Sequence, residues 1–109
     1  MKILHLVLKA QWYDMIDRGE KKEEYREIKP YWSNRLTDYN RIYKWFKDIN
    51  ERKFNISTPC RYTCVCFHRG YTSTTMTFAI ENINIGKGRP EWGAPTDRPV
   101  YIIKLGERL

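Results

Sequence analysis

The chain has 109 residues, of which 41% are hydrophobic, 15% aromatic and 30% charged. This length is typical of one domain, residues 1–109, with one modest core, and four Trp and eight Tyr argue against disorder. A formal net charge of +7 favours an anionic partner, of which nucleic acid is the commonest. The alternative is a surplus of solubilising charge on an ordinary enzyme.

The sequence contains no apolar run long enough to span a membrane, so no membrane association is expected. The short apolar run near the start lacks a small-residue cleavage site and fits a first strand better than a signal peptide. Three Cys are an odd number in a small chain, which argues against a disulfide framework. The sequence therefore predicts a cytoplasmic protein.

The first third of the chain predicts two strands and two helices. Residues 2–9 alternate as a strand does, and residues 10–18 carry apolar side chains at helical spacing. Gly19 stands where a helix often ends in a left-handed residue. Residues 22–28 predict a charged strand, and residues 31–36 predict a short helix beside a proline.

The remaining two thirds predict one long helix and three strands. Residues 37–53 have the spacing of an amphipathic helix, and residues 55–59 are typical of a turn. Alternation predicts strands over 61–68, 74–85 and 100–105, with a Gly/Pro loop before the last one. This order of elements indicates an α+β fold with a small mixed sheet or barrel.

The most informative pattern is Gly19-x-Lys21-x-x-Glu24-x-Arg26. A buried lysine beside a carboxylate can transfer protons, and an arginine can hold a phosphate with two hydrogen bonds. Glu24 and Arg26 share one strand face and can pair directly. Lys21 reaches Glu24 only if it lies in the turn before the strand. The alternative is a solvated strand with weak surface ion pairs.

Four residues in one segment resemble a metal site: Cys60, Cys64, Cys66 and His68. Alternation places the last three on one strand face, with Val65 and Phe67 facing inward. Structural zinc sites usually use Cys-x-x-Cys pairs, and neighbours on one strand face splay apart. Small strand residues with incidental thiols are therefore the favoured interpretation, and no metal or other cofactor is predicted.

Basic and aromatic residues also gather near the predicted turns. Together they could form a surface that stacks on bases and binds phosphate: Lys9, Trp12, Tyr31, Trp32, Arg69, Tyr71, Lys87, Arg89 and Trp92. The alternative is that Trp12 and Trp32 belong to the core. Trp92 lies in the Gly/Pro loop and is the tryptophan most expected to be exposed.

Over nearly its whole length the sequence resembles an ASCH domain, a PUA-like family, in its short stand-alone bacterial and phage form. The similarity rests on the motif above and on flanking pieces: Leu6-Val7-Leu8-Lys9, Gln11-Trp12-Tyr13-Asp14-Met15-Ile16, Tyr25-Arg26-Glu27-Ile28-Lys29-Pro30-Tyr31-Trp32, Phe67-x-x-Gly70-Tyr71, Glu91-Trp92-Gly93-Ala94 and Tyr101-Ile102-Ile103-Lys104-Leu105-Gly106.

The resemblance implies a PUA-like small mixed β-barrel with flanking helices and a cleft bordered by the motif. It implies RNA or a nucleoside as ligand, since some relatives remove the acetyl group of N4-acetylcytidine and others are ribonucleases. In the deacetylating relatives the motif lysine, here Lys21, acts with a threonine three residues later and a late glutamate. The threonine position holds Glu24, which cannot be an alcohol nucleophile, and Glu91 is matched to the late glutamate by loop position.

The sequence thus predicts a domain that binds RNA or a modified nucleotide in a basic cleft around the motif. The residues expected to bind nucleic acid are Lys22, Arg26, Arg69, Tyr71, Lys87 and Trp92. The alternative is a small hydrolase of nucleoside amides or phosphodiesters, with Lys21 as the proton-transfer group and Glu24 and Glu91 as carboxylates. A third possibility is a protein-interaction module whose motif charges are structural. No oligomeric state is predicted.

Overall fold

The computed structural model describes residues 2–36, 56–58 and 62–109. The helix predicted over 37–53 and the thiol of Cys60 lie outside the described residues. Residues 56–58 form a short strand, so the prediction of a turn over 55–59 is wrong there. This strand pairs with the longest strand of the sheet, and a hydrogen-bonded neighbour stabilises an extended backbone that local sequence alone does not specify.

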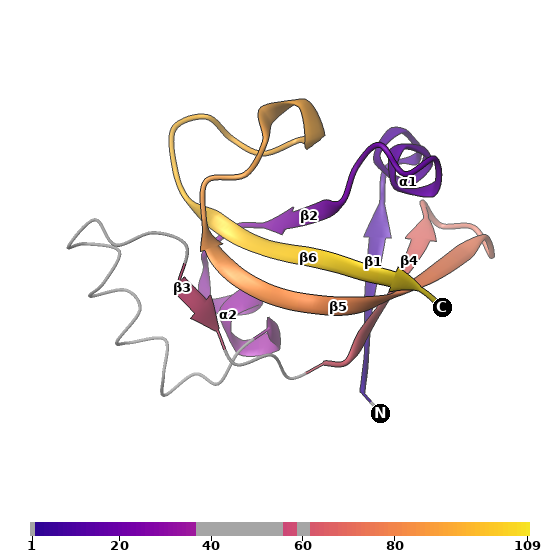
Figure 1. Ribbon diagram of the computed structural model, residues 1–109, viewed down its shortest axis with the longest axis horizontal. Coiled ribbons are helices and arrows are strands. Elements are labelled where there is room, and N and C mark those ends of the chain that lie inside the picture. The colour runs from indigo at the N-terminus through magenta and orange to yellow at the C-terminus, as the bar shows by residue number, and fades with distance from the viewer. Residues whose placement is uncertain (1, 37–55, 59–61) are drawn as a thin grey trace.

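The described strands form one curled, half-barrel sheet (Figure 1). The six strands are β1 (Ile3–Leu8), β2 (Glu23–Arg26), β3 (Ile56–Thr58), β4 (Cys64–Arg69), β5 (Thr75–Gly86) and β6 (Val100–Arg108). Their order is β1-β4-β5-β6-β2, with β3 paired to β5. β1 and β4 are parallel and the other pairs are antiparallel, so the predicted mixed α+β fold is confirmed.

Two helices and one 3-10 turn complete the described fold: α1 (Ala10–Asp17), α2 (Pro30–Leu36) and η1 (Pro90–Trp92). Helix α1 ends as the sequence predicts, because Gly19 has a φ of 80° in the left-handed region. No helix in the described part of the chain is long and apolar enough to cross a membrane.

The core lies on the inner side of the curled sheet. Strand β1 contributes Leu4, Leu6 and Leu8, which are buried, while the residues between them are exposed. Other core residues come from most remaining elements: Tyr13, Ile16, Leu36, Val65, Phe67, Met76, Ile83, Ile85, Tyr101 and Ile103. The alternation expected for β1 is therefore confirmed.

The residues of strand β5 that face the core alternate differently in its first half and in its second half. Met76 is in the core, with Phe78 and Ile80 partly buried against it. Two register shifts follow, between Phe78 and Ile80 and beyond Ile80. A bulge adds a residue to one strand and so reverses the alternation, which is why Ile83 and Ile85 are buried.

Strand β2 is shorter than predicted and brings charged residues to the core side of the sheet. Glu24 lies opposite Ile103 on β6, and Arg26 lies opposite Tyr101. Directly opposite residues share a face, so both charged side chains lie on the side that carries the main core. Tyr25 points to the other side, where it forms a second cluster with Ala94, Val100 and Ile102.

Candidate functional site

The turn between α1 and β2 positions the lysine of the motif. After Gly19, the backbone N–H groups of Glu20 and Lys21 both donate to the carbonyl of Met15, which folds the chain back on the helix end. Strand β2 begins only at Glu23. Lys21 therefore lies before the strand, the condition under which the sequence allows it to reach Glu24.

Lys21, Glu24 and Arg26 form a continuous chain of charge contacts. Lys21 Nζ lies 3.0 Å from Glu24 Oε1, and Arg26 Nη1 lies 2.5 Å from Glu24 Oε2. Arg26 Nη1 also donates to the backbone carbonyl of Tyr25 at 2.7 Å. Lys21 Nζ donates to the backbone carbonyl of Trp92 in η1. The three motif side chains therefore converge, an arrangement that the sequence allowed only if Lys21 lay in the turn before the strand.

Aromatic rings enclose the two cations of this chain. Lys21 Nζ lies 5.0 Å from the ring centre of Trp12 and 4.9 Å from that of Tyr25. The Arg26 guanidinium lies 5.1 Å from the ring centre of Trp32. Such cation–π contacts are stronger when the cation is removed from water, as Lys21 is here.

Burial sets the electrostatics of the site. Removal from water lowers the pKa of Lys21, and the neighbouring Glu24 carboxylate opposes that change. Burial also raises the pKa of Tyr25, whose hydroxyl donates to Glu23 at 2.8 Å and accepts from the backbone N–H of Arg89 at 3.0 Å. The site is thus a buried ion cluster sealed by aromatic side chains.

Two glycines allow the loop between β5 and β6 to approach this cluster. A Cβ on Gly88 would lie 2.5 Å from the Tyr25 ring, so only glycine fits there without movement. Gly93 has a φ of 100°, and a Cβ on it would lie 3.1 Å from Trp12. The loop is therefore packed directly on the motif.

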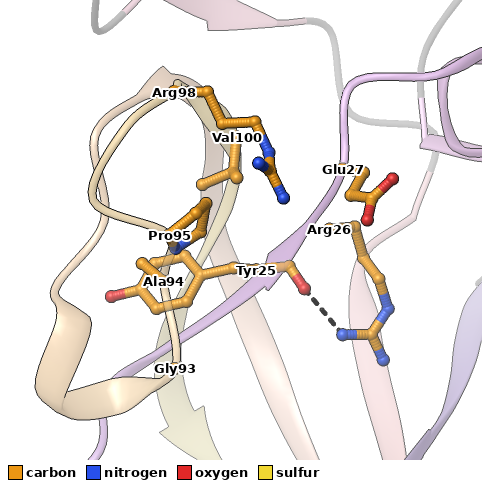
Figure 2. Close-up of a pocket in the computed structure, with 8 residues that line it drawn as sticks. All are labelled: Tyr25, Arg26, Glu27, Gly93, Ala94, Pro95, Arg98 and Val100. Carbon is orange, nitrogen blue, oxygen red and sulfur yellow. Dashed lines mark hydrogen bonds between the residues drawn. The ribbon is translucent and has the colours of Figure 1, made fainter.

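One cavity, here called the β2 cavity, opens between β2 and this loop (Figure 2). Its volume is about 270 Å³, and it is lined by Tyr25, Arg26, Glu27, Gly93, Ala94, Pro95, Arg98 and Val100. Figure 2 shows the Arg98 guanidinium directed from the loop towards β2, with Arg26 on the facing strand. Two arginines from segments far apart in sequence therefore line one cavity.

A second cavity, here called the β6 cavity, has a volume of about 340 Å³. It is lined by Lys22, Glu23, Glu81, Arg89, Trp92, Lys104 and Leu105. Its charges are mixed, since Lys104 pairs with Glu81 at 3.5 Å on its wall. Arg89 lies over the Trp92 ring at 4.7 Å.

The predicted nucleic-acid-binding residues are distributed over two sides of α1. Trp12 of this helix contacts Gly93 of the loop, while Asp14 forms a two-point ion pair with Arg69, at 3.0 and 3.1 Å. Helix residues two apart do not face the same way. The loop residues therefore lie on one side, and the turn that carries Arg69 and Tyr71 lies on another.

On the loop side, Arg26 lines the β2 cavity and Lys22 and Trp92 line the β6 cavity, while Lys87 is exposed. Trp92 is half-buried, less exposed than the sequence suggests, because it packs against the second cluster formed around Tyr25. On the turn side, Tyr71 is 99% exposed.

Two further charged residues, Glu91 and Arg98, lie in the loop between β5 and β6. Glu91 is exposed in η1 and pairs with Arg89 at 3.6 Å; among the described contacts it has no ion pair or hydrogen bond with Lys21. Arg98 was not predicted as a binding residue. Its only signal in the sequence is a positive charge in a proline-flanked loop segment.

The chain matches no known family model, no curated protein and no solved structure.

Proposed function

We propose that this chain is a PUA-like domain of the ASCH type that binds RNA or a modified nucleotide at the β2 cavity. The observation that carries this proposal is that two arginines, Arg26 and Arg98, line this cavity together with the aromatic Tyr25. A volume of about 270 Å³ is just below the range of about 300–1,000 Å³ of pockets for drug-sized ligands. The cavity suits one nucleotide unit of a longer chain.

The buried ion cluster supports this role by holding Arg26 in place. Its Nη1 is fixed by Glu24 and the Tyr25 carbonyl, and its plane lies against Trp32. Among the described residues, the other guanidinium N–H groups make no hydrogen bond, so they can donate to a phosphate. An arginine held in this way loses less conformational freedom on binding.

The hydrolase alternative has weaker support. Lys21 is buried, its Nζ is engaged by Glu24 and the Trp92 carbonyl, and it lines neither cavity. A proton-transfer group has to come within hydrogen-bond reach of the reacting atom. The cluster therefore favours a supporting role for Lys21 over direct contact with a substrate.

The test is the binding of fluorescein-labelled single-stranded RNA, followed by anisotropy over a series of salt concentrations. Arg98 can be replaced with little risk to the fold, because its side chain is 56% exposed and pairs only with Asp97 among the described residues. Arg98→Gln is expected to weaken binding several-fold and to reduce the slope of log K against log salt by about 0.7, the value for one single-stranded phosphate contact.

The matched control is Arg18→Gln. Arg18 is also 56% exposed and also pairs with a neighbouring carboxylate, that of Glu20, at the end of α1. The Arg18→Gln substitution should leave the affinity for RNA unchanged. Equal weakening by both variants would indicate only general attraction to the positive protein and would overturn the β2 cavity as the site.

Two further variants map the path of a longer RNA. Tyr71→Ala removes a ring that is almost wholly exposed, so the fold is not at risk. If RNA crosses the turn side of α1, this change weakens binding, since base stacking on an aromatic ring contributes about 1–3 kcal/mol. Lys87→Gln makes the same test on the loop side.

The same mixtures distinguish binding from catalysis when their products are analysed by mass spectrometry. New product with the wild type that is absent with Lys21→Met would support the hydrolase alternative. Salt-sensitive binding without product supports a binding domain. If the chain binds neither RNA nor free nucleosides at low salt, the proposal is wrong and the protein-interaction alternative is favoured.

A further inference from the structure

A second group of chemically active side chains lies on the outer face of the sheet, across the pair of strands β1 and β4. Because Leu4, Leu6 and Leu8 face the core, His5 between them faces outward. The parallel register places His5 directly opposite Cys66, with His68 two residues further along β4. His5 is exposed, and the other two are partly buried.

Three ligand atoms converge at this position. His5 Nδ1 lies 3.0 Å from His68 Nε2, and Cys66 Sγ lies 3.8 Å from the same nitrogen. All three atoms lie within 4.8 Å of one another. The two imidazole rings are tilted by 48°, with centres 5.3 Å apart, so their nitrogens rather than their faces meet.

These separations fit tetrahedral zinc coordination. Zn–N bonds of about 2.0–2.1 Å and Zn–S bonds of about 2.3 Å place two nitrogens about 3.3 Å apart, and a nitrogen and a sulfur about 3.6 Å apart. The observed 3.0 and 3.8 Å therefore need to change by only a few tenths of an ångström. The third separation, between the His5 nitrogen and the Cys66 sulfur, is at most 4.8 Å and has to shorten to about 3.6 Å if it is at that limit. Rotation of an exposed histidine side chain such as His5 accommodates such a change.

The sequence alone could not identify this set. Cys64, Cys66 and His68 alternate on one strand, where neighbouring side chains are expected to splay apart, whereas Cys66 and His68 approach each other. The third ligand instead comes from β1, 61 positions before Cys66, and only the parallel pairing of β1 with β4 brings it there. The thiol of Cys64 does not belong to the three-residue group.

We propose that His5, Cys66 and His68 form a zinc-binding site with an open fourth coordination position. Two imidazoles and one thiol suit a borderline-soft divalent metal, and three protein ligands leave one position for water or an external ligand. On binding, the Cys66 thiol loses its proton to solvent and the thiolate becomes the ligand.

This site is independent of the proposed nucleotide site. β5 and β6 lie between β4 and β2 in the sheet, so the zinc ligands and the β2 cavity belong to opposite ends of the strand order. Failure of one proposal therefore leaves the other intact. Far-ultraviolet circular dichroism of each variant below reports, without reference to RNA, that the domain is folded.

The experiment is titration of the metal-free full chain with Co²⁺ as a spectroscopic substitute, followed by displacement with Zn²⁺. The expected result is one metal per chain, with the strong visible bands of tetrahedral cobalt and a near-ultraviolet thiolate-to-cobalt band. Cys66→Ala should abolish the thiolate band, and His5→Gln and His68→Gln should weaken binding by at least about tenfold, the lower range seen for supporting groups around metals.

The matched control is Cys64→Ala, which removes a thiol two residues away on the same strand and should leave spectrum and stoichiometry unchanged. A thermal shift gives a second readout, because a metal that binds only the folded chain raises the melting temperature. A thiolate band that survives in Cys66→Ala, or a loss of binding in Cys64→Ala equal to that in Cys66→Ala, would overturn the assignment. Absence of any cobalt spectrum with the wild type would overturn the site altogether.

Discussion

The ammonium group of Lys21 lies 3.0 Å from the carboxylate of Glu24, and their side chains are only 1% and 7% exposed. Each charge has been removed from water at a cost of several kcal/mol, so each depends on the other. The buried pair also ties the turn after α1 to β2 and, through the Trp92 carbonyl, to the loop before β6.

Glu24→Gln is expected to lower the free energy of unfolding by about 3 kcal/mol. The change leaves Lys21 buried without an opposing charge and close to Arg26, although the amide oxygen can still accept a hydrogen bond. Lys21→Met is expected to cost less, about 1 kcal/mol, because Arg26 still pairs with Glu24 and a thioether packs well against aromatic rings. Urea unfolding of the two variants checks the order, and equal losses would contradict it.

The stability contributed by Lys21 is expected to rise with pH in the alkaline range. Its pKa in the folded chain is below the ordinary value of 10.5 because of burial, so between the two values the unfolded chain binds more protons. The free energy of unfolding therefore rises with pH in that window. The measurement is the difference between wild type and Lys21→Met across it, which cancels the opposing titration of Tyr25. If the stability difference between wild type and Lys21→Met falls as pH rises, the pKa of Lys21 is raised in the folded chain and the prediction is wrong.

Gly88→Ala is expected to destabilise the domain by about 1–3 kcal/mol, as overpacking typically does. The new Cβ would lie 2.5 Å from the Tyr25 ring, which the Arg89 backbone and Glu23 hold in place. The matched control is Gly106→Ala, where the closest atom would be 3.5 Å away, an ordinary contact. Thermal melting of both variants tests whether the loop is packed on β2; similar melting temperatures would contradict that packing.

Helix α2 is expected to depend on a buried contact between two hydroxyl groups. Ser33 Oγ and Tyr101 Oη lie 2.6 Å apart, and this bond joins α2 to β6. A double-mutant cycle with Ser33→Ala and Tyr101→Phe should give a coupling energy of about 0.5–1.5 kcal/mol, the net value of a typical hydrogen bond. A coupling energy near zero would show that other contacts of these residues dominate.

Much of the local structure could be predicted because it depends on neighbours in sequence. The alternation in β1, the end of α1 at Gly19 and the direct pairing of Glu24 with Arg26 all follow from spacing of four residues or fewer. These features need only backbone geometry and side-chain period. The bulges of β5 and the strand β3 could not be predicted, because both depend on which strand lies alongside.

Composition and local patterning were enough to predict the α+β order of elements, the positive charge and a Lys–Glu–Arg motif after a helix end. Tertiary packing was needed to bury this motif, to bring Arg26 and Arg98 to the lining of one cavity, and to join His5 with Cys66 and His68. The reason is physical: burial and convergence arise where segments distant in the chain pack together, and those contacts depend on sheet pairing that no short window of sequence contains.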